Sequence, residues 1–164
     1  MGQRVTVTTP SERELLISRD FNAPRRLVFR ALSEPELVRQ WLLGPPGWTM
    51  PVCEIDFRVG GKYRYVWRNE DGRDMGMGGT YREIARPERV VATELFDEDW
   101  TGGETLNTTT LTEESAKTRM DILVLYASKE ARDGALATGM TKGMEIGFDR
   151  LDTLVARLAV GETS

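Results

Sequence analysis

The stretch CEIDFRVGGKYRYVWR, residues 53–68, has the clearest periodicity in the chain. Apolar and polar side chains alternate on both sides of Gly60-Gly61, which is typical of two antiparallel strands joined by a tight turn. One face of this pair carries Phe57, Tyr63, Tyr65 and Trp67. The stretch therefore predicts a β-hairpin with an aromatic inner face.

Strand patterns continue on both sides of the hairpin. Upstream, residues 14–21 alternate in the same way. Downstream, residues 75–86 form a glycine-rich segment in which we expect a bend or bulge. Three further segments are rich in strand-forming residues and are separated by turn residues. They span residues 89–96, 104–112 and 117–126. We expect an antiparallel sheet of about seven strands.

Two short helices should follow the first strand. Asn22 is a good N-cap, Pro24 suits a first helical turn, and apolar residues then recur at helical spacing. Pro35 restarts the pattern, which must stop before the GPPG sequence at residues 44–47. By element order, Trp41 and residues 44–47 either edge the mouth of a cavity or form a structural turn with the indole packed beneath it.

The last segment changes to a helical period. Ser128 can act as an N-cap, and apolar residues recur in steps of three and four as far as Leu158, which predicts one helix of about eight turns. Gly139, Gly143 and Gly147 sit beside this stripe, although each costs about 1 kcal/mol relative to alanine in a helix. We expect them to form a smooth groove along one flank. The segment is too polar for a membrane helix.

Composition excludes several classes of function. The 164 residues suit one domain, and 26 acidic against 22 basic residues argue against a nucleic-acid partner. The chain has no histidine, which removes imidazole metal sites and Ser-His or Cys-His catalysis. Its single cysteine, Cys53, is expected in the core of a protein from a reducing compartment. We predict no metal and no cofactor.

The expected organisation is one helix-grip domain over residues 14–160. Residues 1–13 are predicted to be disordered or loosely attached, and residues 161–164 to form a tail. The chain shows no targeting segment and no apolar run of the ~18 residues that a membrane span needs. We therefore expect a cytoplasmic protein without a membrane span, either a monomer or a homodimer.

Short sequences along the chain carry a family resemblance. They include RDFNAPR at 19–25, RVGG at 58–61, GTYREI at 79–84, PERVV at 87–91 and FDRL at 148–151. They resemble the activator of heat-shock protein 90 ATPase homologue-like family, which belongs to the START/SRPBCC superfamily of Bet v 1-like proteins, polyketide cyclases and lipid-transfer proteins. The resemblance covers about residues 14–158 and is closest to bacterial proteins. It implies an α+β helix-grip fold, in which a curved antiparallel sheet wraps around a long C-terminal helix.

The resemblance and the residue pattern together lead to three hypotheses about function. A curved sheet and a straight helix separate toward one end, and the cavity left between them suits a hydrophobic or aromatic small molecule. The family name suggests a chaperone partner instead, although no second, N-terminal chaperone-binding domain fits before residue 14. A weak cyclase-like or hydrolase-like activity is the third reading, with no recognisable catalytic residues.

The candidate ligand-binding residues follow from strand and helix alternation. They are Arg19, Trp41, Phe57, Tyr63, Tyr65, Trp67, Met120, Ile122, Met140, Met144 and Phe148, with Val124 and Tyr126 also facing inward. A filled core is the alternative for each apolar residue. Buried tyrosines need hydroxyl partners and methionines repack easily, and both properties favour a pocket. Met144 should lie near its centre.

Charged side chains on inner faces are the remaining candidates. Arg19 lies between Ile17 and Phe21 on the inner face of the first strand and needs an anionic partner there. That partner is either an internal carboxylate such as Glu94 or an anionic ligand. Glu83, Glu94 and Asp56 are candidates for acid–base chemistry if buried, with structural ion pairing as the alternative.

Overall fold

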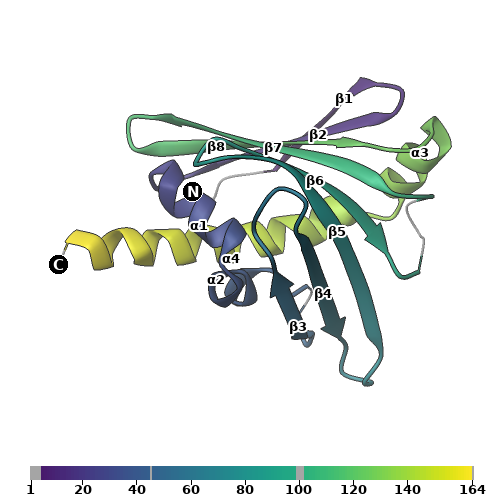
Figure 1. The fold of residues 1–164 in the computed structure, drawn as a ribbon, viewed down its shortest axis with the longest axis horizontal. Helices are drawn as coiled ribbons and strands as arrows, with labels where there is room; N and C mark the ends of the chain where they lie inside the picture. The colour runs from purple at the N-terminus through teal and green to yellow at the C-terminus, as the bar shows by residue number, and fades with distance from the viewer. Residues whose placement is uncertain (1–4, 45, 99–101, 164) are drawn as a thin grey trace.

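The computed structural model describes residues 5–44, 46–98 and 102–163, and these fold into one open antiparallel sheet with helices on its concave side (Figure 1). The strands are β1 (Thr6–Ser11), β2 (Glu14–Phe21), β3 (Thr49–Ile55), β4 (Lys62–Arg68), β5 (Asp74–Ala85), β6 (Arg89–Phe96), β7 (Thr105–Glu114) and β8 (Lys117–Leu125). The helices are α1 (Arg25–Ser33), α2 (Pro35–Trp41), α3 (Lys129–Ala137) and α4 (Met140–Thr163). The strand order is β1-β2-β8-β7-β6-β5-β4-β3. The predicted α+β helix-grip fold is confirmed.

The described sheet has eight strands, one more than the sequence predicts. The additional strand, β1, pairs antiparallel with β2 and lies within residues 1–13, where we expected no regular element. It is an edge strand with mostly exposed side chains, so it lacks the alternation of a half-buried strand that would reveal it. Its backbone pairing with β2, rather than burial of its side chains, supports it.

The C-terminal segment forms two helices instead of the single helix predicted from residue 128. Ser128 caps α3 as expected, with its hydroxyl accepting a hydrogen bond from the backbone N–H of Ala131 at 3.0 Å. Gly139 then adopts a φ of +75°, a left-handed conformation that ends a helix and that glycine adopts without strain. The helical spacing of apolar residues therefore continues across both helices, although the helix itself is interrupted at Gly139. At its other end, α4 runs past residue 160 to Thr163, where a tail was expected.

The aromatic hairpin is β3 and β4, but β3 ends earlier than the alternation suggests. After Ile55 the chain leaves the sheet, and Gly60 has a φ of +84° in the connecting turn. Val59, which continues the apolar alternation of Phe57, is 60% exposed. Phe57 still reaches the interior, because its ring packs edge-on against Phe29 of α1 and Tyr81 of β5.

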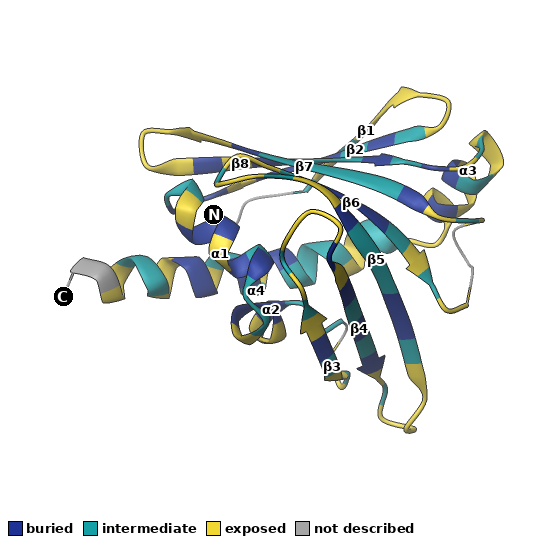
Figure 2. Cartoon of the chain, viewed as in Figure 1, coloured by how far each residue is buried: buried dark blue, intermediate teal, exposed yellow. Residues whose placement is uncertain are grey.

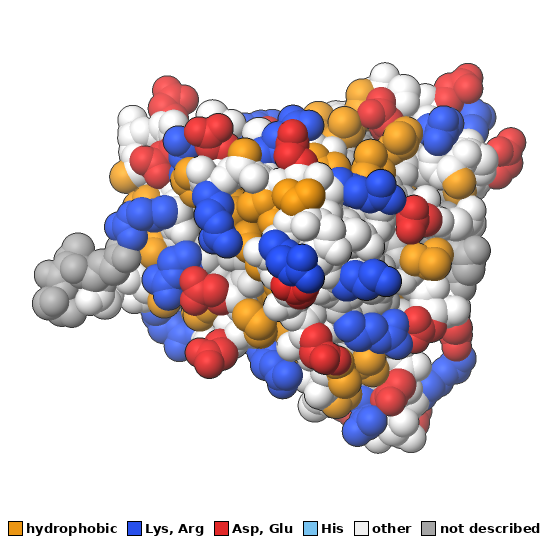
Figure 3. Space-filling view, in the orientation of Figure 1, with side chains coloured by type: hydrophobic (Ala, Val, Ile, Leu, Met, Phe, Trp, Pro, Cys, Tyr) orange, Lys and Arg blue, Asp and Glu red, His pale blue; other side chains and the backbone are white. Residues whose placement is uncertain are grey.

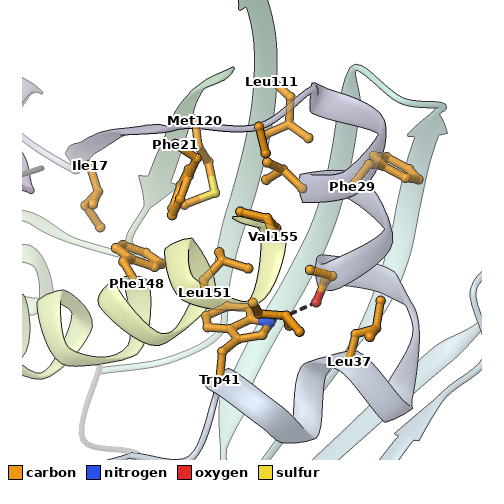
Figure 4. Close-up of a cluster of buried hydrophobic side chains, with 14 of the residues drawn as sticks. Ile17, Phe21, Phe29, Leu37, Trp41, Leu111, Met120, Phe148, Leu151 and Val155 are labelled. Atoms are coloured by element: carbon orange, nitrogen blue, oxygen red, sulfur yellow. Dashed lines mark hydrogen bonds between the residues drawn. The ribbon is translucent and has the colours of Figure 1, made fainter. Parts of the chain in front are cut away.

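The main core lies between α4 and the β1-β2-β8-β7 half of the sheet. Phe148, Leu151 and Val155 on α4 pack among side chains from β2, β7 and β8 and from α1 and α2 (Figure 4). Phe21 meets Phe148 edge-to-face, with ring centroids 6.2 Å apart. Full burial of such side chains contributes about 1.5–3 kcal/mol each. This contact attaches α4 to the sheet.

A second buried cluster covers the other half of the sheet. Along β4 the side chains alternate between buried and more exposed positions, as Figure 2 shows for the strands on the lower right. The buried members are Val38, Met50, Cys53, Tyr63, Tyr65, Trp67, Met77, Tyr81 and Ala92. Cys53 is a buried core residue with a free thiol, as predicted. No helix in the described part of the chain is long and apolar enough to cross a membrane.

Two glycines show opposite constraints. A Cβ on Gly79 would lie 1.8 Å from the carbonyl oxygen of Thr93, so β5 and β6 approach more closely there than any other residue allows. A Cβ on Gly143, in contrast, would meet no neighbouring element within 4 Å, because this glycine lies in the exposed face of α4. Along the flank where the glycines were expected to form a smooth groove, Gly147 touches another element, at Trp41, whereas a Cβ on Gly139 or Gly143 would meet none within 4 Å.

We expect Gly79→Ala to destabilise the protein by about 2 kcal/mol or more, because backbone has to move to admit the methyl group. Gly143→Ala should stabilise it by about 0.5–1 kcal/mol, since alanine is the better helix former. Urea unfolding of both variants beside the wild type measures the two effects. An equal change of unfolding free energy in the two variants would contradict the close approach of β5 and β6 at Gly79.

Arg19 joins β2 to α4. Its side chain is 2% exposed, with Nη1 2.9 Å from Oδ1 of Asp149 and Nη2 3.9 Å from Oδ2 of Asp152. Nε and Nη1 make no hydrogen bond of good geometry within the described residues, and the guanidinium lies 5.2 Å from the Phe21 ring centroid. Of the two expected partners, a carboxylate of the chain itself is the one observed, but it is not Glu94: the anions come from α4, at the far end of the chain.

Arg19 and Asp149 differ in exposure, so replacing one or the other should affect stability differently. Asp149 is 67% exposed and can be solvated alone, whereas Arg19 cannot. We expect Arg19→Met to change the free energy of unfolding by less than about 1 kcal/mol and Asp149→Ala to lower it by about 2 kcal/mol, because the latter leaves a buried cation poorly paired. In the Arg19→Met background, Asp149→Ala should cost little. Chemical denaturation of the wild type, the two single variants and the double variant gives a double-mutant cycle. A larger loss of unfolding free energy in Arg19→Met than in Asp149→Ala would contradict this assignment.

Candidate functional site

An apolar cavity of about 380 Å³ separates the two buried clusters. It lies under α4, between the curved sheet and the side chains of α1 and α2. Its described lining comprises Ile17, Leu32, Val38, Trp41, Leu42, Phe57, Tyr63, Tyr65, Trp67, Met77, Tyr81, Val90, Ala92, Glu94, Phe96, Thr105, Asn107, Thr109, Ile122, Val124, Tyr126, Met140 and Met144. The volume falls in the range of small-molecule sites, about 300–1,000 Å³.

One wall of the cavity is a row of aromatic rings on β4. The ring centroids of Tyr63 and Tyr65 are 5.1 Å apart, and those of Tyr65 and Trp67 are 5.9 Å apart. Tyr81 of β5 extends the row, 5.3 Å from Tyr63. The hydroxyl of Tyr63 donates to the carbonyl of Thr93 at 2.6 Å, passing over Gly79. The close approach at Gly79 thus fixes the position of this wall.

The indole groups that line the cavity are anchored by backbone carbonyls. Nε1 of Trp41 donates to the carbonyl of Ala31 at 2.8 Å, the dashed line in Figure 4, and Nε1 of Trp67 donates to the carbonyl of Leu42 at 2.8 Å. Both rings therefore offer apolar surface to the cavity rather than their N–H groups.

Gly44, Pro46 and Gly47, from the segment expected either to edge the cavity mouth or to form a structural turn, are absent from the described lining. Gly44 is held by α4, because Nη1 of Arg150 donates to its carbonyl at 2.7 Å. Pro45 lies outside the described residues. The rim assignment stays a prediction.

Glu94 is the one charged residue in the described lining. It points inward from β6 and accepts a hydrogen bond from Nδ2 of Asn107 on β7 at 3.2 Å. No hydrogen bond to its other oxygen, Oε1, occurs among the described residues, and this oxygen is not fully enclosed by protein, since Glu94 is partly exposed. Burial raises the pKa of Glu94 to about 7, and the Asn107 hydrogen bond opposes this shift only in part.

A carboxyl group with this pKa can gain or lose a proton at neutral pH. The described lining contains no cysteine, serine, lysine or arginine that could act with it as a nucleophile or counter-ion. No group of three metal-ligating side chains occurs among the described residues. The other carboxylates proposed for acid–base work lie at the surface, where Asp56 pairs with Arg58 and Glu83 with Arg89.

The surface itself carries no extended patch of one charge on the face seen in Figure 3, where acidic and basic side chains are intermixed. Exposed ion pairs such as Arg68 with Asp74, 2.7 Å apart, account for part of this pattern. The cavity is therefore the candidate ligand site.

The model of the family described as "activator of Hsp90 ATPase homolog 1-like protein" matches residues 22–156. The chain belongs to this family. The match includes most of the helices and strands that surround the cavity, from α1 to α4. No curated protein sequence matches the chain.

Solved structures from bacteria share the fold of this family member. A protein from Rhodobacter sphaeroides has 34% sequence identity and a TM-score of 0.89, over 94% of this chain and 99% of that chain. A protein from Arthrobacter aurescens has 26% identity and a TM-score of 0.80, over 93% and 91% of the two chains. An AHSA1-like protein from Aeromonas hydrophila, with 17% identity and a TM-score of 0.66 over 87% and 93%, shares the fold.

In this family member, the cavity brings together eight of the eleven residues proposed as ligand contacts. They are Trp41, Phe57, Tyr63, Tyr65, Trp67, Ile122, Met140 and Met144. The other three lie outside the lining. Met120 and Phe148 belong to the filled core beneath α4, as Figure 4 shows, and Arg19 pairs with that helix. Inward orientation alone did not separate core from cavity, because both lie on the same side of the sheet.

The polar part of the lining was only partly anticipated. Glu94 was a candidate without a secure position, and Thr105, Asn107 and Thr109 were not proposed. A signal for Glu94 does exist: Val90, Ala92, Glu94 and Phe96 occupy strictly alternate positions and all line the cavity. Apolar residues on the opposite face of β6 hide this period.

The pKa of Glu94 makes a prediction about stability. Because its folded pKa of about 7 lies above the usual 4.5, the folded protein holds this proton between those pH values and the unfolded chain does not. Stability should therefore fall as pH rises through this window. Relative to Glu94→Gln, the wild type should lose about 2–3 kcal/mol of unfolding free energy between pH 5 and pH 8.

Urea denaturation of both proteins at these pH values measures that difference. The exposed Glu114 on β7 provides the matched control, since Glu114→Gln should follow the wild type at both pH values. A constant difference between wild type and Glu94→Gln would show that Glu94 titrates normally.

Proposed function

We propose that this protein binds a hydrophobic or aromatic small molecule in the cavity between the sheet and α4. The observation that carries the proposal is the composition of the lining, in which aromatic and aliphatic side chains surround one carboxyl group. Small-molecule sites have this character, with apolar walls and a few polar groups that fix orientation. The volume of about 380 Å³ is sufficient for a ligand of drug-like size.

The family description supports a second candidate, a protein that acts on a heat-shock chaperone. The two candidates differ in what they need. A ligand-binding protein requires the cavity, whereas a chaperone partner requires a surface and would change ATP turnover without any small molecule. Adding the purified wild type or its Met144→Trp variant, in which the cavity is filled, to a chaperone ATPase assay separates them.

The direct test is to identify what the protein retains. Native mass spectrometry of the purified protein, followed by denaturation and analysis of released small molecules, should show an apolar compound in stoichiometric amount. Titration of the stripped protein with this compound should change tryptophan fluorescence to saturation, because Trp41 and Trp67 line the cavity.

Met144→Trp should fill the cavity and lower affinity for apolar ligands at least about tenfold, because the indole occupies space that the ligand needs. Met144 lies on α4 and contacts the cavity with part of its surface, so the larger side chain can enter it without displacing the core. Fluorescence or calorimetric titration measures affinity, and circular dichroism checks the fold.

Val160→Trp is the matched control, because Val160 lies on the same helix, is 69% exposed and is absent from the lining. This variant should bind as the wild type does. A folded Met144→Trp protein with unchanged affinity would place the ligand elsewhere.

A further inference from the structure

The cavity has an unusual electrostatic composition. It contains one acidic side chain, Glu94, and no lysine or arginine among its described lining residues. The single hydrogen bond from Asn107 leaves Oε1 of Glu94 without a partner in the described chain. An ionised carboxylate in such surroundings is costly unless a cation or a hydrogen-bond donor meets it. Because Oε1 is accessible and unpaired within the described chain, it is open to a donor from a bound molecule.

Four of the protein's own donors in the lining are directed elsewhere. The hydroxyl of Tyr63 is committed to the carbonyl of Thr93, and both indole N–H groups are committed to backbone carbonyls. The hydroxyl of Tyr126 is directed to the sulfur of Met140 at 3.9 Å. A bound molecule is then the natural source of a donor for Glu94.

The charge of that molecule can be inferred from the same lining. An anionic ligand such as a fatty acid would bring a second negative charge next to Glu94, with no cation among the described lining residues to offset either one. A protonated amine would neutralise the carboxylate through a charge-assisted hydrogen bond. The neighbouring rings, including Tyr63 on β4, offer faces that attract cations further.

We propose that the cavity selects a hydrophobic amine, whose ammonium group donates a hydrogen bond to the carboxylate of Glu94 while its apolar body packs against the aromatic wall. This inference rests on the proposed function and adds the chemical class of the ligand. Asn107 positions the carboxylate through the opposite oxygen.

Binding should depend on pH through Glu94. Its pKa of about 7 means that the carboxylate form needed for an amine becomes dominant above neutrality. The other titratable groups of the described lining are Tyr63, Tyr65, Tyr81 and Tyr126, whose pKa values are all raised by burial and so lie far above this range. Outside the lining, the carboxylate of Glu104 acts on Tyr63 together with Glu94. The β7 and α4 residues of the described lining, such as Asn107 and Met144, do not titrate. Amine affinity should therefore rise between pH 6 and pH 8.

Three probes of nearly equal shape test the proposal: phenylbutylamine, phenylbutanol and phenylbutanoate. Titration at pH 8, followed by tryptophan fluorescence and by calorimetry, should give the tightest binding for the amine, by about tenfold over the alcohol, and the weakest for the carboxylate. Glu94→Gln should reduce amine affinity about tenfold, abolish its pH dependence and leave alcohol affinity within about twofold. Glu114→Gln is the matched control and should behave as the wild type.

The outcomes distinguish this inference from the proposed function. If the alcohol binds in the cavity, as its loss in Met144→Trp would show, and the amine binds no better, the amine preference is wrong and the hydrophobic site stands. An unchanged preference in a folded Glu94→Gln protein would also overturn the inference. If none of the three probes binds, both proposals fail.

Discussion

The packing of one straight helix against a curved sheet is the constraint on which the rest of this structure depends. α4 can follow only part of the sheet, and it packs against the half formed by β2, β8 and β7, with α1 and α2 beside it. The strands from β6 to β3 curve away and build their own buried cluster around the aromatic rings of β4. The space between the two clusters is too large for side chains of either to fill.

This division explains why a half-buried carboxyl group is tolerated at Glu94. The free energy lost by desolvating it is offset by apolar packing elsewhere, above all by Phe148 and Leu151 of α4 in the main core. Arg19 is more deeply buried and has a different environment, because α4 supplies Asp149 beside it. Arg19 thus helps to attach α4 to the sheet, whereas Glu94 faces the cavity.

Much of the fold could be predicted from sequence because its signals, such as the alternation in β4 and the cap at Ser128, act locally. Strand β1 and the break at Gly139 escaped prediction, because one depends on pairing with a neighbour and the other leaves the apolar spacing intact. The site was harder, since alternation defines only a face. Met120 and Met144 both face the interior, yet the first is packed on all sides and the second borders open space. The partner of Arg19 lies too far along the chain for any local pattern to record it.

The separation of the two buried clusters also bears on how proteins of this family can diverge. A side chain such as Met144 lacks packing partners on its cavity side, so changing its size alters the volume of the cavity before it strains the core. Phe148, one helical turn away, has no such freedom. Substitutions on the cavity wall can accordingly change the volume and polarity of the cavity while the packing of α4 against the sheet stays the same.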